Sequence, residues 1–300
     1  MREASETPRL RDRYEALLLD LDGTLYRGSA VVEGGPAELA GGTQRLVYVT
    51  NNASRAAGAV AAHLAELGYP AGETDVVTSA QAAGRLLAER VERGAEVLVV
   101  GTDDLAAEVK AAGLQPVRRA AESVAAVVQG HSPQTAWPDL AEASYALRAG
   151  AVWVAANTDR TLPNERGLAP GNGAMVAALR AATDREPTVA GKPYPPLLED
   201  ALASAGTRAA LVVGDRLDTD IDGAENVALD SLLVLTGVST VEELAGLPEQ
   251  RWPTYIAGSL AALNNAPVDG GIGEPAAIRR ELLAHPDRAL RVRAPRSEIR

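Results

Sequence analysis

Short apolar runs recur along the chain, and each ends in a small or polar residue. The runs are rich in Val, Leu and Ala and are too short for typical helices, which is characteristic of strands buried on both faces. Such strands are bounded by Gly, Asp, Asn or Thr, as these runs are. We therefore predict strands at 16–22, 45–52, 97–102, 125–130, 151–157 and 209–215.

Alanine-rich stretches with the apolar spacing of amphipathic helices lie between the runs, for example at 54–68 and 195–206. Alternating strands and helices are typical of a parallel sheet that carries helices on both faces. The predicted fold class is therefore α/β with a Rossmann-like parallel sheet. In such sheets ligands bind at the carboxyl ends of the strands, so the polar residues there are candidate functional residues.

Two carboxylates end the first predicted strand, "ALLLDLD", at Asp20 and Asp22. Neighbouring like charges destabilise one another unless a cation lies between them. On a continuing strand these side chains share a face, and Mg²⁺ is the hard, oxygen-binding ion that such a pair suits. A single Asp-x-Asp pattern is more typical of a strand-ending turn, with Asp22 capping a helix, so further motifs are needed to indicate a metal site.

Three further stretches carry chemistry at or near predicted strand ends. "VTNN" offers Thr50, Asn51 and Asn52, whose polar groups can hold a phosphoryl oxygen. "AGKP" places Lys192 between a glycine and a proline. A third stretch follows a buried run with four acids, Asp215, Asp218, Asp220 and Asp222, which would repel strongly without a cation. Together these stretches indicate a site for a phosphate and a divalent cation.

The order DLDGT, TNN, GKP and GDRLDTD closely resembles the four motifs of haloacid dehalogenase (HAD) superfamily phosphatases. The insertion between TNN and GKP resembles the cap of the type IIA, NagD-like subgroup, and 155–179 resembles that subgroup's signature. The resemblance covers about 14–260. It implies a HAD core at 1–79 and 186–265, interrupted by an α/β cap domain at 80–185. We expect the Arg-rich remainder, 266–300, to be a disordered extension.

The resemblance also implies roles for individual residues. Asp20 would be the nucleophile that forms an aspartyl-phosphate, and Asp22 the general acid and then the general base. Lys192 would offset the negative charge of Asp20 and the phosphate. The phosphoryl group and substrate would be bound by Thr50, Asn51, Asn52 and Asp159. Mg²⁺ would be held by Asp20, the backbone carbonyl of Asp22, Asp215 and, in support, Asp220.

The subgroup includes phosphatases of phosphoglycolate, pyridoxal phosphate and 4-nitrophenyl phosphate. Overall similarity favours glycerol 3-phosphate as the substrate here, and these other small phosphomonoesters are the alternatives. Polar side chains at Asn157, Asp159 and Asn164 could bind substrate hydroxyls. A phosphomutase would share both aspartates. A signalling receiver would share the acids, a Thr and a Lys, but receivers are shorter and would not place a base beside a stable phospho-aspartate.

Composition narrows the class of protein further. The net charge of -11 over 300 residues argues against nucleic-acid partners. The absence of cysteine excludes disulfides, thiolate metal sites and cysteine nucleophiles. We see no signal-peptide core and no apolar stretch of the roughly 18 residues that a membrane span needs. We therefore expect a cytoplasmic enzyme whose partners are a small substrate and, as the resemblance implies, a second copy bound through the cap.

Overall fold

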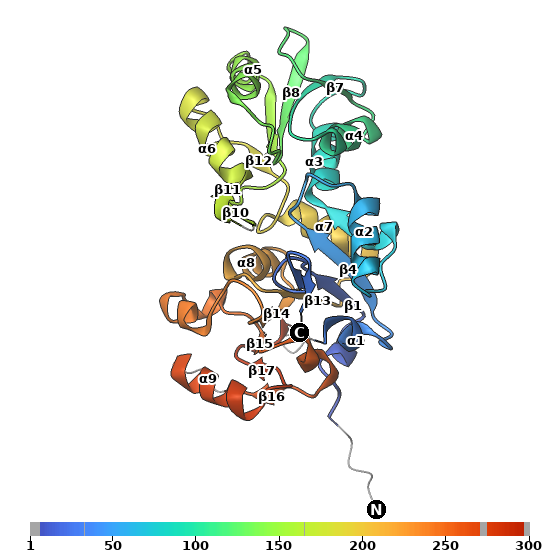
Figure 1. The fold of residues 1–300 in the computed structure, drawn as a ribbon, viewed down its shortest axis with the longest axis vertical. Helices are drawn as coiled ribbons and strands as arrows, with labels where there is room; N and C mark the ends of the chain where they lie inside the picture. The colour runs from blue at the N-terminus through green and yellow to red at the C-terminus, as the bar shows by residue number, and fades with distance from the viewer. Residues whose placement is uncertain (1–6, 33, 165, 271–274, 297–300) are drawn as a thin grey trace, which may run out of the picture. The chain divides into compact units, whose positions relative to one another are not determined.

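The computed structural model describes residues 7–32, 34–164, 166–270 and 275–296, and the chain divides into two compact units (Figure 1). Unit 1 comprises Met1–Val49, Ala61–Asp75 and Ala201–Arg300, and unit 2 comprises Thr50–Val60 and Val76–Asp200. Each unit is built around its own sheet of mainly parallel strands with helices packed against it. The predicted fold class, α/β with a parallel-sheet core, is confirmed.

The sheet of unit 1 is centred on β1 (Ala16–Leu19), which pairs in parallel with β13 (Ala210–Gly214) and β4 (Arg45–Thr50). All four residues of β1 are buried, which explains its uninterrupted apolar sequence. Beyond β13 the strands follow in the order β14 (Asp230–Val234), β15 (Tyr255–Ala257), β17 (Leu290–Arg291) and β16 (Val268–Asp269), and β17 runs antiparallel to β15.

The other elements of unit 1 are a β-hairpin, helices and 3₁₀ turns. They are the hairpin strands β2 (Tyr26–Arg27) and β3 (Ala30–Val31), the helices α1 (Gly35–Leu39), α8 (Asp222–Asn226) and α9 (Pro275–Ala284), the π-helix η3 (Leu217–Ile221), and the 3₁₀ turns η1 (Arg11–Arg13), η2 (Glu73–Asp75), η4 (Val241–Gly246), η5 (Glu249–Arg251) and η6 (Leu260–Asn264). One core cluster packs Leu233, Ile256 and Leu290 of the sheet against Ile221 of η3 and Ile278 of α9. Two longer helices, α2 (Ala57–Glu66) and α7 (Pro195–Ala205), have residues in both units.

Unit 2 contains a parallel sheet in the order β12 (Thr188–Val189), β9 (Val152–Ala155), β8 (Val124–Gln129), β6 (Glu96–Val100) and β7 (Gln115–Val117). Helices α5 (Trp137–Arg148) and α6 (Asn172–Thr183) lie on one side of it, and α3 (Ser79–Ala88) and α4 (Asp103–Ala111) on the other (Figure 1). The remaining strands of the unit are β5 (Val76–Thr78) and the antiparallel hairpin of β10 (Thr161–Asn164) and β11 (Gly167–Pro170).

Alternation along the strands explains why helices cover both faces of the unit 2 sheet. Leu98, Val127 and Trp153 join the cluster that α5 and α6 complete, whereas their strand neighbours point to the opposite face and are also buried. The start of α3 is fixed by a capping box. The Thr78 hydroxyl accepts from the Gln81 N–H at 3.2 Å, and the Gln81 side chain accepts from the Thr78 N–H at 2.9 Å.

The six predicted strands and both predicted helices are present, with ends displaced by a few residues. We did not predict β14 and β15, although "SLLVL" has the same apolar character as the other runs. The unit boundaries also differ from the predicted domain boundaries, because 50–60 and 76–79 group with unit 2, and so does the segment 186–200. This segment is attached there by the pairing of β12 with β9 and by the Ala190 N–H, which donates to Ala155 O at 2.9 Å.

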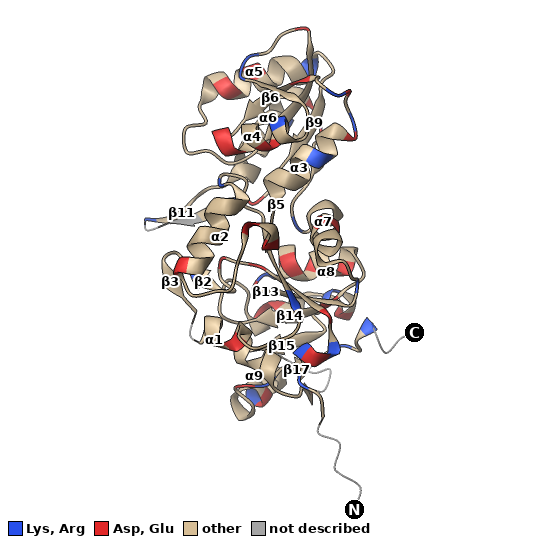
Figure 2. Cartoon of the chain, turned by 90° about the vertical axis from the view of Figure 1, so that its right-hand side faces the viewer, with Lys and Arg blue, Asp and Glu red and all other residues tan. Residues whose placement is uncertain are grey.

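The expectation that 266–300 is disordered does not hold for the described residues of that segment. Leu290 is completely buried and pairs with Ile256, and Ile278 of α9 is 1 % exposed. The arginine content misled the sequence interpretation, because these cations bind acids of unit 1. Arg293 donates to Glu225 at 2.6 Å, and Arg296 pairs with the same carboxylate. Among the described residues, basic and acidic positions lie mainly on helices and loops (Figure 2).

None of the described helices combines the length and hydropathy that crossing a bilayer requires.

The double ion pair at Glu225 should make stability depend on pH. Burial raises the pKa of this carboxyl, but hydrogen bonds from Arg296 and Arg293 outweigh burial, so the pKa lies below its ordinary value of 4.5. A lowered pKa contributes stability above the unfolded-state value, and that contribution is lost as the pH falls through the folded-state value. We predict that Glu225→Gln lowers the free energy of unfolding by about 1 kcal/mol at pH 7 and by less at pH 4.

Urea unfolding at the two pH values measures this difference. Glu242→Gln is the matched control, because Glu242 pairs with Arg279 where both side chains are more than half exposed. The control should change stability little at either pH. A loss in Glu225→Gln that is equal at pH 7 and pH 4 would contradict the role assigned to the ion pair.

Candidate active site

The carboxyl ends of β1 and β13 bring two predicted site residues together in unit 1. The strands are parallel neighbours with Leu19 opposite Val213, so Asp20 and Asp215, which follow them, lie at one edge of the sheet. The Asp20 N–H donates to Val213 O at 2.9 Å and continues the ladder by one bond. Asp215 is completely buried.

A π-helix brings the third carboxylate to this edge. The N–H groups of Asp220 and Ile221 both donate to Arg216 O, at 3.1 and 3.2 Å, and the wide turn returns Asp220 toward the strand end. The Arg216 N–H then donates to the Asp220 carboxylate at 3.1 Å. Asp20, Asp215 and Asp220 each offer a carboxylate oxygen, and these oxygens lie within 4.8 Å of one another. We call these three residues the acid cluster.

Backbone and hydroxyl donors orient the acid cluster. The Val238 N–H donates to Asp215 Oδ2 at 2.7 Å, and the Ser239 N–H donates to Asp215 O at 3.0 Å. The Thr24 hydroxyl donates to Asp20 Oδ2 at 3.4 Å. Gly23 has a φ of +87°, which favours glycine, and a Cβ there would also overlap the Asp215 carboxylate. The glycine of DLDGT therefore makes both the turn and the close approach possible.

The donor set fits a hard divalent cation. Carboxylate oxygens are the preferred ligands of Mg²⁺ and Ca²⁺, and three buried or half-buried carboxylates this close together require positive charge nearby. Asp22 differs from the other acids of the first motif: its side chain is exposed and is not part of the acid cluster. Of the acids after Asp215, Asp218 pairs with Arg216 and Asp222 pairs with Arg251.

The second motif lies in unit 2 and has two different side-chain environments. Asn52 accepts from both the N–H and the hydroxyl of Ser54, at 2.8 and 2.6 Å, which makes its side chain part of a local turn. Thr50 is 5 % exposed, and its hydroxyl accepts from the Asn52 N–H at 3.0 Å.

Asn51 contacts two other predicted site residues. Its side-chain oxygen accepts from the Lys192 N–H at 2.7 Å, and its amide nitrogen donates to Lys192 O at 3.0 Å and to the Asp159 carboxylate at 3.2 Å. Lys192 is 2 % exposed. Asn51 O in turn accepts from Ser79 and Asn157, each at 2.6 Å. We call Asn51, Asp159 and Lys192 the amide–lysine cluster.

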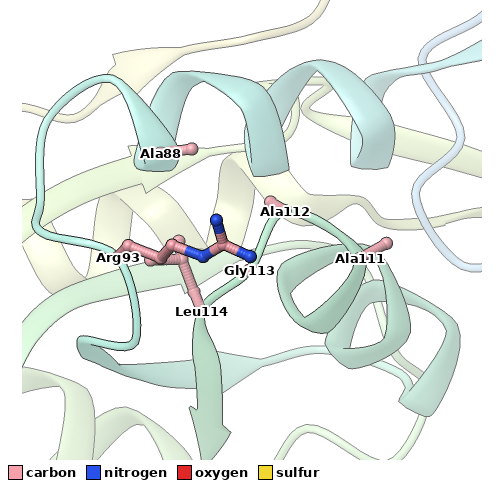
Figure 3. Close-up of a pocket in the computed structure, with 6 residues that line it drawn as sticks. All are labelled: Ala88, Arg93, Ala111, Ala112, Gly113 and Leu114. Atoms are coloured by element: carbon pink, nitrogen blue, oxygen red, sulfur yellow. The ribbon is translucent and has the colours of Figure 1, made fainter.

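The sequence interpretation missed the residues that support both clusters. Thr24 was visible within DLDGT, but Ser79, Val238 and Ser239 carry no motif of their own. Only their position in the chain indicates a role: Ser79 directly follows β5, and Val238 and Ser239 lie in the loop after β14. A surface pocket of about 410 Å³ in unit 2 contains none of the predicted site residues; its lining is Ala88, Arg93, Ala111, Ala112, Gly113 and Leu114 (Figure 3).

Comparison with known proteins defines the class of protein that carries these clusters. Residues 17–115 match the family model of haloacid dehalogenase-like hydrolases, and 189–263 match a second HAD-hydrolase-like model. The chain belongs to the haloacid dehalogenase-like hydrolases and is an enzyme of the phosphatase class, as predicted.

Two similar phosphatases and one solved structure show how much of the chain is shared with known proteins. The chain is 55% identical over 255 residues to D-glycerol 3-phosphate phosphatase of Mycobacterium tuberculosis, covering 85% of this chain and 72% of that protein. It is 37% identical over 260 residues to acid sugar phosphatase of Staphylococcus aureus, covering 85% of this chain and 97% of that protein. A crystal structure of glycerol phosphate phosphatase from M. tuberculosis in complex with magnesium superposes with a TM-score of 0.85 at 52% identity, covering 88% of this chain and 83% of that one.

The glycine at 237 should be essential for ion binding at the acid cluster. A Cβ at this position would overlap the Asp215 carboxylate, which is also held by the Val238 N–H. We predict that Gly237→Ala displaces this carboxylate and weakens Mg²⁺ binding by about tenfold or more. Isothermal titration with Mg²⁺ measures the change.

Gly246→Ala is the matched control, because a Cβ there meets no atom within 4 Å. It should bind Mg²⁺ like the unaltered protein. Equal Mg²⁺ affinity in Gly237→Ala and Gly246→Ala would contradict the prediction that the close approach of Gly237 to Asp215 is needed for ion binding.

Proposed function

We propose that the protein is a Mg²⁺-dependent phosphomonoesterase that works through an aspartyl-phosphate on Asp20. The observation that carries the proposal is the acid cluster, in which the residue expected to be the nucleophile lies beside two buried carboxylates. The magnesium complex of the relative at 52% identity supports the choice of ion. Asp20, Asp215 and Asp220 would hold the ion through their side chains, and Asp22 through its backbone carbonyl.

The proposed reaction has two steps. In the first, a carboxylate oxygen of Asp20 attacks phosphorus, the bond from phosphorus to the ester oxygen breaks, and Asp22 donates a proton to the leaving alcohol. In the second, Asp22 removes a proton from water, which attacks phosphorus and releases inorganic phosphate and free Asp20. The exposure of Asp22 and its separation from the acid cluster fit a group that exchanges protons with substrate and water.

Charge neutralisation is the other requirement of phosphoryl transfer. When bound, Mg²⁺ supplies positive charge to the phosphoryl oxygens and to the crowded carboxylates. We assign Lys192 the second positive charge, on the phosphoryl group and Asp20. Thr50 and the backbone that follows it would bind the phosphoryl oxygens. Asn52 would bind them through its amide nitrogen, because its amide oxygen accepts from Ser54.

For the substrate we propose glycerol 3-phosphate. The relative at 55% identity is a D-glycerol 3-phosphate phosphatase. In this chain, Asp159 of unit 2 offers a carboxylate suited to substrate hydroxyls, whereas the Asn157 side chain is buried and donates to Asn51 O at 2.6 Å. The alternatives are phosphoglycolate, pyridoxal phosphate and other small phosphomonoesters. The named relatives are phosphatases, and no observation favours a phosphomutase or a receiver.

A homodimer formed through the inserted unit and a cytoplasmic location stay predictions. The exposed aromatic side chains of α5, Trp137 and Tyr145, at 76% and 59% exposure, are consistent with such a dimer.

Substitution of the two aspartates of DLDGT tests the mechanism. Asp20→Asn should lower turnover of every phosphomonoester by several orders of magnitude, about 10⁴-fold or more, because the nucleophile is removed. Asp22→Asn removes the proton donor, so hydrolysis of an alkyl phosphate should fall further than hydrolysis of 4-nitrophenyl phosphate, whose leaving group needs no proton. Phosphate release in the presence of Mg²⁺ measures both effects.

Circular dichroism and thermal unfolding establish that both variants are folded. A folded Asp20→Asn variant with normal turnover would refute the nucleophile. Equal losses of the alkyl and aryl substrates in Asp22→Asn would refute the general acid, and full activity in excess EDTA would refute the metal requirement.

The substrate proposal is tested by kcat/KM for glycerol 3-phosphate and phosphoglycolate at saturating Mg²⁺. We expect a higher value for glycerol 3-phosphate, because a site with polar partners for hydroxyls discriminates against a ligand that leaves them unpaired. Asp159→Ala should narrow the ratio by about tenfold. A higher kcat/KM for phosphoglycolate in the unaltered protein would overturn the substrate while leaving the phosphatase mechanism intact.

A further inference from the structure

The side-chain amide of Asn51 pairs with the backbone of Lys192 in both directions. Its oxygen accepts from the Lys192 N–H at 2.7 Å, and its nitrogen donates to Lys192 O at 3.0 Å. Two neighbouring strands exchange hydrogen bonds in this way, and here one side chain does so. A primary amide carries its donor and its acceptor on separate neighbouring atoms, as this pairing needs, and Asn has a shorter reach than Gln.

Asn51 is itself held from the backbone side. Its carbonyl oxygen accepts from the Ser79 hydroxyl and from the Asn157 amide, each at 2.6 Å. Ser79 is the first residue of α3, and Asn157 follows β9, so two elements of the unit 2 fold fix the position of Asn51. The chain around Lys192 is therefore attached to the unit through a side chain whose own backbone is anchored.

The glycine before Lys192 allows this pairing. A Cβ on Gly191 would lie 2.6 Å from Asn51 Oδ1 and 2.7 Å from Ala156 O, closer than real Cβ atoms approach. The Gly191 backbone lies where a side chain would displace the Asn51 amide. The Gly-Lys pair of the third motif and the first Asn of the TNN motif are thus parts of one packing arrangement.

The same amide nitrogen also donates to the Asp159 carboxylate, at 3.2 Å to Oδ1 and 3.4 Å to Oδ2. A primary amide has two N–H donors, and Lys192 O and Asp159 account for both. The side chain that the sequence indicated as a phosphate ligand therefore has no donor left for a phosphoryl oxygen.

We propose that Asn51 is a positioning residue. Its side chain sets the place of Lys192 through the lysine backbone and ties Asp159 to the same amide. The inference rests on the proposed function only in the role it assigns to Lys192, namely to neutralise charge on the phosphoryl group. Asp159 and Lys192 share one amide, so the residue assigned to substrate hydroxyls and the residue assigned to the phosphoryl group are held by a common support.

Residue-resolved amide hydrogen exchange, followed by NMR, tests the positioning without any activity. In Asn51→Ala the Lys192 N–H loses its acceptor and should exchange about tenfold faster or more. The Ala190 N–H, which donates to Ala155 O at 2.9 Å, should be unchanged and serves as the internal control. Unchanged exchange at Lys192 in Asn51→Ala would overturn the proposal.

A double-mutant cycle tests the functional consequence. Asn51→Ala should lower kcat for 4-nitrophenyl phosphate by about 10- to 100-fold with little change in KM, as expected when a charged group is misplaced. Lys192→Met keeps the length of the side chain and removes its charge. If Asn51 acts through Lys192, adding Asn51→Ala to Lys192→Met should lower kcat by less than about twofold. Two outcomes would overturn the proposal and indicate a direct phosphate ligand. One is a double variant in which the two single losses of kcat multiply, and the other is an Asn51→Ala variant whose lower kcat/KM comes from a higher KM.

Thr183→Val is the structural control, because it removes one buried hydrogen bond at the end of α6 in unit 2, from the Thr183 hydroxyl to Leu179 O at 2.7 Å, and Thr183 belongs to neither cluster. It should lower the melting temperature without altering kcat or Lys192 exchange. If the unaltered protein hydrolyses no phosphomonoester, the proposed function fails, whereas the exchange result still decides whether Asn51 positions Lys192.

Discussion

The crowding of three carboxylates at the end of a buried sheet is the constraint on which unit 1 depends. Oxygens of Asp20, Asp215 and Asp220 lie within 4.8 Å of one another, and Asp215 and Asp220 are almost fully buried. At that separation two negative charges repel by about 3 kcal/mol at an effective dielectric constant of ~20. Such an arrangement is stable only beside positive charge, and for this reason the acid cluster suits a divalent cation.

The surrounding backbone is arranged to keep these carboxylates in place. The parallel pairing of β1 with β13 sets two of them side by side, and the π-helix returns the third. Glycines occupy the positions where a Cβ would displace a carboxylate, at 23 and 237 beside Asp215 and at 214 beside Asp220. The site therefore requires small residues as much as acidic ones, and a substitution that adds only one methyl group has a chemical consequence.

In unit 2, neutral amide and hydroxyl groups hold the backbone of a charged residue in place. In the proposed mechanism Lys192 neutralises charge on the phosphoryl group, so its position has to be held accurately. In this structure the backbone of Lys192 is held by the Asn51 amide, and the backbone of Asn51 by Ser79 and Asn157. In the C-terminal segment, charged side chains provide the attachment, because Arg293 and Arg296 both form ion pairs with Glu225.

The sequence alone determined the α/β class, the main strands and the residue types of the site, because apolar runs and the acids that end them are local features. The resemblance of its motifs to the family also indicated that Asp20, Asp215 and Asp220 lie together, as the acid cluster does. It could not show that the Asn51 side chain pairs with the Lys192 backbone or that the Arg-rich segment packs. Those outcomes depend on contacts between residues far apart in the chain, such as 51 with 192 and 225 with 293. Only the tertiary structure decides which of several possible partners a polar side chain meets, because hydrogen-bond geometry is set by the packing of whole elements and not by spacing along the chain.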